Sequence, residues 1–254
     1  MNVDLNSDMG ESYGAWRMGD DLALLGHVSS ANIACGFHAG DPDTMARTAA
    51  AAVQRGVAIG AHPSLPDLQG FGRRTMQISE SEAYGITLYQ AAAMQGFARA
   101  AGTTMRHVKA HGALYNMAAK DAKLSGAICR AVRDLDPKLV VFALAGSVMV
   151  DVARDMGLPV AQEVFADRSY QDDGSLTPRS HAGAMITDLQ QSIAQVRRML
   201  HEGFVRSLTG ADVPIRADTI CLHGDQPGAA VFAAAMREAL VADGIAIRSP
   251  GGTA

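Results

Sequence analysis

Four of the eight histidines in this 254-residue chain stand in short polar motifs that directly follow an apolar run. A lysine and two carboxylates occupy the same kind of position elsewhere in the chain. Histidine titrates near neutral pH and is a frequent metal ligand, so such residues suit general acid/base catalysis or cation binding. The predicted catalytic set is Asp8, His38, His62, Lys109, His111, Glu163 and His223.

Other polar residues in the same motifs could contact a substrate without transferring protons. The predicted substrate-binding set is Asn6, Asn32, Asp41, Arg168, Arg179 and Asp225. Taken singly, some have simpler explanations, because Asp41 precedes Pro42 and is placed to cap a helix, and Asn32 could bond only the backbone. Asp167 and Arg168 could form a surface ion pair that contributes little to stability. The regular placement after apolar runs favours a shared site.

Two questions about this cluster stay open in the sequence. Asp8, His38 and His62 could form a metal site of one carboxylate and two imidazoles, although the chain has no HExxH motif. A divalent metal is therefore an alternative to metal-free acid/base chemistry. Lys109 could stabilise a substrate carboxylate or an oxyanion, or it could be the buried ion-pair partner of Glu163.

Parallel strands would bring these residues together. Short apolar or β-branched runs alternate with helical patterns, which is typical of βαβ units. Strands are expected at residues 3–5, 30–34, 57–61, 107–110, 139–144, 160–164, 219–222 and 245–247. Because parallel strands all point the same way, the residues at their carboxyl ends converge on one face.

Helices are expected at residues 42–55, 79–102, 119–134, 147–156, 187–202 and 227–243. The first has Asp41 as a capping residue and Pro42 in its first turn, and the second opens with the capping-box pair Ser79 and Glu82. The long irregular segments 63–77 and 165–180 each follow a strand and are typical of functional loops.

The chain shows no long linker, repeat or low-complexity tract, which predicts a single α/β barrel domain over residues 1–254. An open doubly wound sheet has the same alternation of strands and helices. The opening VDLNSDMGES lacks the GxGxxG turn of a dinucleotide-binding sheet, which favours the barrel.

The composition of the chain indicates which classes of partner and which cellular location to expect. The chain is 48% hydrophobic and 19% charged, with a formal net charge of -4, so nothing favours nucleic acid or an anionic membrane as a partner. No basic stretch followed by an apolar run opens the chain, and no segment has the length of a membrane span. Three widely spaced cysteines indicate neither a zinc ribbon nor a disulfide scaffold. The expected location is the cytoplasm.

Seven motifs in a fixed order resemble the LamB/YcsF family, which forms the A subunit of the bacterial 5-oxoprolinase. They are DLNSDMGE, NIACGFHAGDP, GAHPSLPD, GFGRR, VKAHGALYN, EVFADRSY and HGD. The resemblance covers nearly the whole chain. It implies an irregular (β/α) barrel of about seven parallel strands, similar to the glycoside hydrolase/deacetylase superfamily.

The resemblance also implies an activity, the opening of 5-oxo-L-proline to L-glutamate with ATP as co-substrate, in a complex with 5-oxoprolinase subunits B and C. The chain has no GxxxxGK[ST] phosphate loop, so ATP use would involve partners or a nonstandard site. Phosphorylation of the amide oxygen would activate the lactam toward water. The base could be Asp8 or one of His38, His62 and His111, with Lys109 and Arg168 or Arg179 balancing negative charge.

Two other classes of function remain as alternatives. The chain could be a stand-alone metal-dependent hydrolase or deacetylase, which would contain a stoichiometric metal. It could also be a non-catalytic substrate-binding or regulatory subunit, in which case replacing His62 or His111 would leave turnover of the complex near normal.

Overall fold

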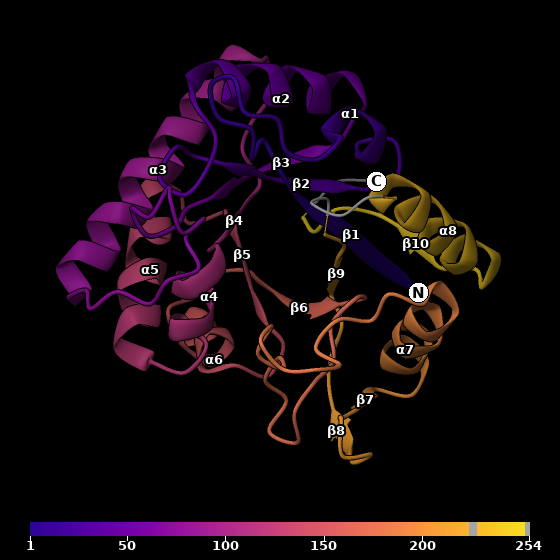
Figure 1. Ribbon diagram of the computed structural model, residues 1–254. Coiled ribbons are helices and arrows are strands. Elements are labelled where there is room, and N and C mark those ends of the chain that lie inside the picture. The colour runs from indigo at the N-terminus through magenta and orange to yellow at the C-terminus, as the bar shows by residue number, and fades with distance from the viewer. Residues whose placement is uncertain (224–227, 252–254) are drawn as a thin grey trace.

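A computed structural model describes residues 1–223 and 228–251, and its centre is a closed barrel of seven parallel strands (Figure 1). The barrel strands are β1 (Asn2–Met9), β2 (Ser30–Ala34), β3 (Ala58–His62), β4 (His107–Lys109), β5 (Val140–Leu144), β6 (Val160–Phe165) and β9 (Thr219–Cys221). Each pairs with the next in that order, and β9 closes the circle by pairing with β1, where Asp4 lies opposite Thr219. The predicted irregular barrel is confirmed.

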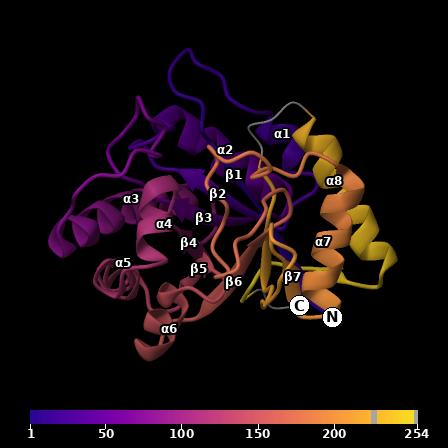
Figure 2. The ribbon, with the colours of Figure 1, turned by 60° about the horizontal axis from the view of Figure 1, so that its bottom comes forward.

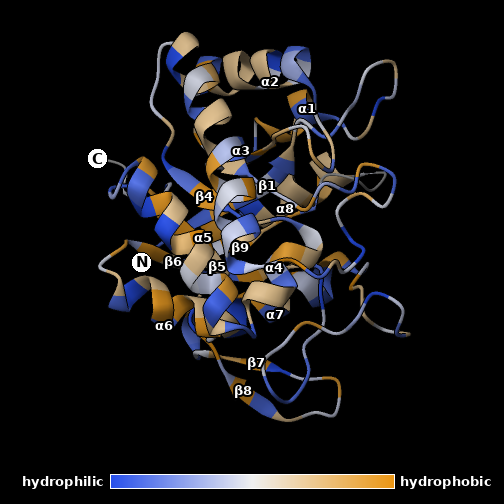
Figure 3. Ribbon diagram, turned by 90° about the vertical axis from the view of Figure 1, so that its left-hand side faces the viewer, coloured by the Kyte–Doolittle hydropathy of each residue, from blue (hydrophilic) through white to orange (hydrophobic). Residues whose placement is uncertain are grey.

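Helices surround the barrel on its outer side (Figure 1). They are α1 (Asp21–Leu24), α2 (Pro42–Gln54), α3 (Glu80–Ala100), α4 (Gly112–Ala118), α5 (Ala122–Leu135), α6 (Val148–Asp155), α7 (Leu189–His201) and α8 (Ala229–Ala242). Hydrophobic and hydrophilic segments alternate along the outer helices, as expected of helices with one face on the sheet (Figure 3). The strands are buried on both faces, which explains their nearly continuous apolar runs.

Both helix starts predicted from capping signals are confirmed. Asp41 accepts a hydrogen bond from the backbone N–H of Thr44 at 2.7 Å, and Pro42 occupies the first turn of α2. Ser79 and Glu82 form the complete capping box of α3. These side chains satisfy N–H groups that have no partner within the helix, and so they define where each helix begins.

Other elements differ from the sequence prediction. The helix expected at residues 119–134 is α5, which begins after its capping residue Asp121, and the short helix α4 just before it was not predicted. An antiparallel hairpin of β7 (Phe204–Arg206) and β8 (Asp212–Pro214) follows α7, and α1 was also not predicted. The strand expected at residues 245–247 is present as β10 (Ala246–Ile247), which pairs with β1 outside the barrel. The helix α1 and the two hairpin strands are too short to show a clear periodicity in the sequence.

The loops that follow the carboxyl ends of the strands gather at one end of the barrel (Figures 2 and 3). The longest are residues 63–79, between β3 and α3, and residues 166–188, between β6 and α7. No helix in the described part of the chain combines the length and apolar character that a membrane span requires. The barrel end with these loops is where a site is expected in such a fold.

The barrel interior contains a polar layer in which one glycine is indispensable. The His107 ring stacks on Phe142 with centroids 4.1 Å apart, and its Nε2 lies 2.7 Å from Asn32 Oδ1. A Cβ added to Gly60 on β3 would lie 2.1 Å from His107 Nε2. Because its two partners restrain the imidazole, the ring cannot move aside without losing them.

We therefore expect Gly60→Ala to lower the free energy of unfolding by about 1 to 3 kcal/mol or more, the usual effect of overpacking a core. Urea unfolding followed by circular dichroism measures this. Gly96→Ala is the matched control, since Gly96 is in the exposed part of α3 and an added Cβ meets nothing within 4 Å. The control should be neutral or stabilising by up to about 1 kcal/mol, and equal effects at both positions would contradict the packing argument.

Candidate active site

A buried lysine stands at the centre of the site. Lys109, at the end of β4, places its Nζ 2.9 Å from Asp8 Oδ1 and 2.8 Å from Glu163 Oε1. Only 3% of its side chain is exposed. Asp8 comes from β1 and Glu163 from β6, so the ammonium group joins three strands across the barrel interior.

Two amides and a phenol hold the carboxylate partners in place. Asn6 Nδ2 donates to Glu163 Oε1 at 3.0 Å, and the Tyr115 hydroxyl donates to Glu163 Oε2 at 2.7 Å. Asn32 Nδ2 donates to both Asn6 Oδ1 and Asp8 Oδ1. Glu163 is fully buried, so these donors and Lys109 replace the water that an isolated carboxylate would need.

Burial and ion pairing shift the pKa values of Lys109 and Asp8 in opposite directions. Burial lowers the pKa of Lys109, but Asp8, Cys221 and Glu163 outweigh it and raise that pKa well above its ordinary value. Burial likewise raises the pKa of Asp8, but His62 and Lys109 outweigh it and hold that pKa well below its ordinary value. Lysine and aspartate are therefore both charged at neutral pH.

Two histidines extend the site from Asp8 toward the loops. His62 Nε2 lies 3.2 Å from Asp8 Oδ2 and 3.0 Å from His111 Nδ1. The other nitrogen of each ring faces a backbone carbonyl: His62 Nδ1 lies 2.8 Å from the oxygen of Lys109, and His111 Nε2 lies 2.9 Å from that of Phe71. Backbone contacts therefore fix the orientation of both rings.

A third histidine and a glutamate complete a group that could hold a metal. His38 stacks on His111 with centroids 3.9 Å apart, and His38 Nε2 lies 3.7 Å from Glu11 Oε1. One ligand atom from each of Glu11, His38, His62 and His111 lies within 4.8 Å of the others. The carboxylate of this group is Glu11, whereas the triad considered from the sequence used Asp8, which pairs with Lys109.

A separate histidine and aspartate pair, His223 and Asp167, also belongs to the site, and a ring nitrogen of His223 lies within 4.8 Å of a carboxylate oxygen of Asp8. His223 Nδ1 is 2.7 Å from Asp167 Oδ2 and 2.9 Å from Asp167 Oδ1. Burial raises the pKa of Asp167, but His223 outweighs that effect and the net pKa is lowered. An ionised aspartate fixes the imidazole by one nitrogen and leaves the other for proton transfer.

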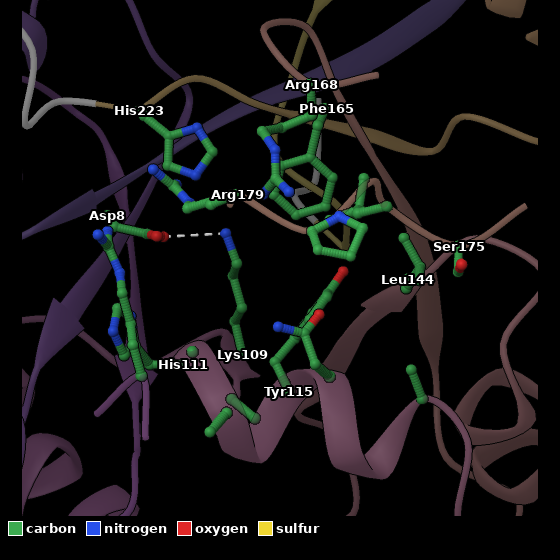
Figure 4. A pocket seen from close by; sticks show the side chains of 18 of the residues that line it. Asp8, Lys109, His111, Tyr115, Leu144, Phe165, Arg168, Ser175, Arg179 and His223 are labelled. Atoms are coloured by element: carbon green, nitrogen blue, oxygen red, sulfur yellow. Dashed lines mark hydrogen bonds and ion pairs between the residues drawn. The ribbon is translucent and has the colours of Figure 1, made fainter. Parts of the chain in front are cut away.

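These groups open into a cavity of about 420 Å³. Arg168 and Arg179 bring positive charge to the His223 side of the cavity, and Phe165, Tyr115 and Leu144 form apolar parts of its wall (Figure 4). The Arg168 side chain is buried and donates to the carbonyls of residues 177 and 184, so loop 166–188 holds it in place. The cavity can receive a small ligand with an anionic group and a polar reacting group.

The predicted site residues fall into three groups. Those that line the cavity are Asp8, His62, Lys109, His111, Arg168, Arg179 and His223. Those that support the lining from behind are Asn6, Asn32, His38 and Glu163. The prediction that Asp41 binds substrate is not supported, because Asp41 does not line the cavity. Its side chain caps α2, which was the alternative explanation, and also accepts a hydrogen bond from the Gly14 N–H. Asp225 lies outside the described residues.

Several residues at the site were not singled out from the sequence. Tyr115 and Phe165 lie inside the motifs VKAHGALYN and EVFADRSY, but their types alone suggest only core packing. Arg73 and Glu11 also line the cavity, from a loop and from just after β1. The position of Tyr115 four residues after His111 could have indicated a side chain facing the site.

Comparison with known proteins places the chain in a family. Residues 3–253 match the family model described as the LamB/YcsF family. The chain belongs to the LamB/YcsF family. This LamB/YcsF protein is 64% identical over 247 residues to the 5-oxoprolinase A subunit of Bordetella pertussis, covering 97% of this chain and 98% of the relative. It is 56% identical to the 5-oxoprolinase A subunit of Tolumonas auensis, with the same coverage.

Solved structures agree with the barrel. This LamB/YcsF protein superposes on the lactam utilization protein from Thermus thermophilus with a TM-score of 0.92 and 46% identity, covering 98% of this chain and 99% of that one. A putative cellobiose-phosphate cleavage protein from Enterococcus faecalis gives a TM-score of 0.56 at 16% identity, covering 98% and 97%. At that identity the second likeness shows the fold alone.

The ion-pair contacts of Lys109 generate a stability prediction. Lys109 belongs to the predicted catalytic set, and its role as the ion-pair partner of Glu163 was the alternative. Lys109→Ala would leave the carboxylates of Asp8 and Glu163 buried without their cation. We expect the free energy of unfolding to fall by about 3 to 5 kcal/mol, measured by urea unfolding at pH 7.

The double variant Lys109→Met with Glu163→Gln is the control for this prediction. It removes the cation together with one of its anions and keeps similar side-chain volumes, so it should recover part of the lost stability. A Lys109→Ala variant as stable as the original chain would contradict the ion-pair role and leave only a role in catalysis.

Proposed function

We propose that this chain is the A subunit of an ATP-dependent 5-oxoprolinase and that its cavity binds the lactam whose ring is opened to L-glutamate. The observation that carries the proposal is the 64% identity, over nearly the full length of both chains, to a protein named as the A subunit of 5-oxoprolinase. The name of the structural relative, a lactam utilization protein, supports the same class of substrate.

The charges of the cavity suit 5-oxo-L-proline, a five-membered cyclic amide with one carboxylate. Arg168 and Arg179 offer guanidinium groups on one side of the cavity, and guanidinium is well matched to a carboxylate. The ring amide would then face Lys109, Asp8 and the histidines. Phe165 provides an apolar surface for the methylene groups of the ring.

Activation by ATP would overcome the low reactivity of an amide. The amide oxygen forms a bond to the γ-phosphorus as the bond to ADP breaks. Water then adds to the activated carbon and gives up a proton, and the ring C–N bond breaks as the nitrogen takes up a proton. The resulting acyl phosphate loses phosphate to a second water, so the products are glutamate, ADP and phosphate.

In the proposed reaction His223 transfers the protons. Asp167 binds Nδ1 and stabilises the imidazolium form, so the other nitrogen can accept a proton from water and deliver one to the ring nitrogen. The candidate bases considered from the sequence, Asp8, His38, His62 and His111, are less suited. The low pKa of Asp8 makes it a weak base, and the histidines contact one another or backbone carbonyls.

ATP as co-substrate and the B and C subunits as partners belong to the same proposal. The chain has no GxxxxGK[ST] loop, which supports a partner as the source of the phosphate-binding elements. The relatives are named as one subunit of an enzyme, which supports a complex.

We expect the isolated chain to release no glutamate from 5-oxo-L-proline with ATP, because it lacks a phosphate loop. Adding the candidate partner subunits should produce glutamate, ADP and phosphate in equal amounts. Glutamate is measured by an enzyme-coupled assay, with and without ATP. Full ATP-dependent turnover by this chain alone would contradict the need for partners, and ATP-independent turnover would favour a stand-alone hydrolase.

Asp167→Asn tests the proton-transfer pair. The amide cannot stabilise the imidazolium form of His223, so kcat of the reconstituted complex should fall by about 10²-fold or more while KM changes little. Steady-state kinetics at several pH values provide both constants.

Asp155→Asn is the matched control, since Asp155 ends α6 on the exposed surface and does not line the cavity. It should leave kcat and KM unchanged. Near-normal kcat in Asp167→Asn would favour the alternative of a substrate-binding subunit without a catalytic role.

A further inference from the structure

The hydrogen bonds of His62 and His111 determine which ring nitrogens carry protons. The carbonyl oxygens of Lys109 and Phe71 can only accept, and they lie 2.8 Å from His62 Nδ1 and 2.9 Å from His111 Nε2. Each of those nitrogens therefore donates an N–H. In a neutral ring, the remaining nitrogens, His62 Nε2 and His111 Nδ1, then hold lone pairs.

The two nitrogens with lone pairs lie close to each other and to a carboxylate. His62 Nε2 is 3.0 Å from His111 Nδ1 and 3.2 Å from Asp8 Oδ2. Three acceptors at this distance repel one another unless a positive charge lies among them. That charge is either one additional proton or a bound cation.

His38 distinguishes these two explanations. It is 1% exposed, and neither of its ring nitrogens has a hydrogen-bond partner in the part of the chain that the structure describes. Buried polar groups are rarely left unsatisfied, and one shared proton between His62 and His111 would do nothing for His38. A cation bound by all three imidazoles would satisfy His38 as well.

Neutral imidazole is the form that binds metals, and each neutral ring keeps one nitrogen with a lone pair.

We propose that His38, His62, His111 and Glu11 form a binding site for one divalent transition metal ion of the Zn²⁺, Co²⁺ or Mn²⁺ class. A tetrahedral ion with ligands at about 2.1 Å separates its ligand atoms by about 3.4 Å. The observed separations are 3.0 Å between His62 and His111, 3.7 Å between His38 and Glu11, and 3.9 Å between His111 and Glu11. Only small side-chain movements would complete the site.

The position and the ligands of this site determine how an ion would reach it and which ions it would prefer. Glu11, His62 and His111 line the cavity, so the ion would be reached from the same side as the substrate. Three imidazoles and one carboxylate suit transition metals, whereas Ca²⁺ and Mg²⁺ prefer oxygen ligands. The proposal concerns metal binding and does not depend on which molecule occupies the cavity.

Cobalt binding to the full-length chain tests the proposal directly. The chain is freed of metal with a chelator, which is then removed, and is titrated with Co²⁺ under calorimetry and visible absorption. We expect one equivalent to bind, with the absorption bands of a four- or five-coordinate ion and a higher melting temperature. A folded chain that binds no equivalent of Co²⁺, Zn²⁺ or Mn²⁺ would overturn the proposal.

Variants locate the ion. His38→Ala should weaken Co²⁺ binding by at least about tenfold and change the spectrum, whereas His201→Ala, an exposed histidine at the end of α7, should change neither. If His38→Ala does not fold, Glu11→Gln replaces it, with the same expected loss. Unchanged binding in a folded His38→Ala or Glu11→Gln variant would place the ion elsewhere and overturn the assignment. Neither measurement uses 5-oxo-L-proline, so the result is independent of the proposed function.

Discussion

The arrangement of this barrel depends on one buried positive charge. Lys109 cannot remain charged inside the barrel without anions, and two carboxylates from different strands provide them at 2.9 and 2.8 Å. Each carboxylate in turn needs further donors, which Asn6, Asn32 and Tyr115 supply. One ammonium group thus dictates the residue types at several interior positions on at least four elements.

The interior is not polar throughout, because a small apolar cluster lies on β5 and β6. Val140, Phe142 and Ala161 pack together in a small cluster apart from the main core. The imidazoles and carboxylates are at the strand ends, where the loops can reach them. A barrel filled with branched apolar residues would be simpler to stabilise, so the buried polar network indicates that function shaped the interior.

The sequence was sufficient to predict the fold and most of the residues at this end of the barrel. Strand ends are visible because an apolar run stops at a polar motif, and the caps at Asp41 and Ser79 are local signals. The sequence could not show which of these residues line the cavity and which support the lining from behind. His38 and Glu163 lie near strand ends just as His62 and Lys109 do, and only the three-dimensional packing places the first two behind the others.

Residues on short or irregular elements were also beyond sequence analysis. Tyr115 is on α4, a helix of seven residues that begins at a glycine with a φ of 58°. Such a helix has neither the length nor the capping residue that a periodicity argument requires. Glu11 and Arg73 belong to loops, and their proximity to the histidines depends on long-range packing that one sequence does not reveal.

The closure of the barrel by β1 and β9 has a consequence for how the chain reaches this structure. Asp4 on β1 accepts a hydrogen bond from Thr219 on β9, 215 residues later, and Asn6 donates to the same hydroxyl. Contacts of such high sequence separation form slowly, since a very long loop must close first. During synthesis the earliest strand must therefore wait for nearly the last one, and the interior stays open to water until then. A nascent chain released before β9 emerges would expose that interior, because the barrel cannot close without the pairing of β9 with β1.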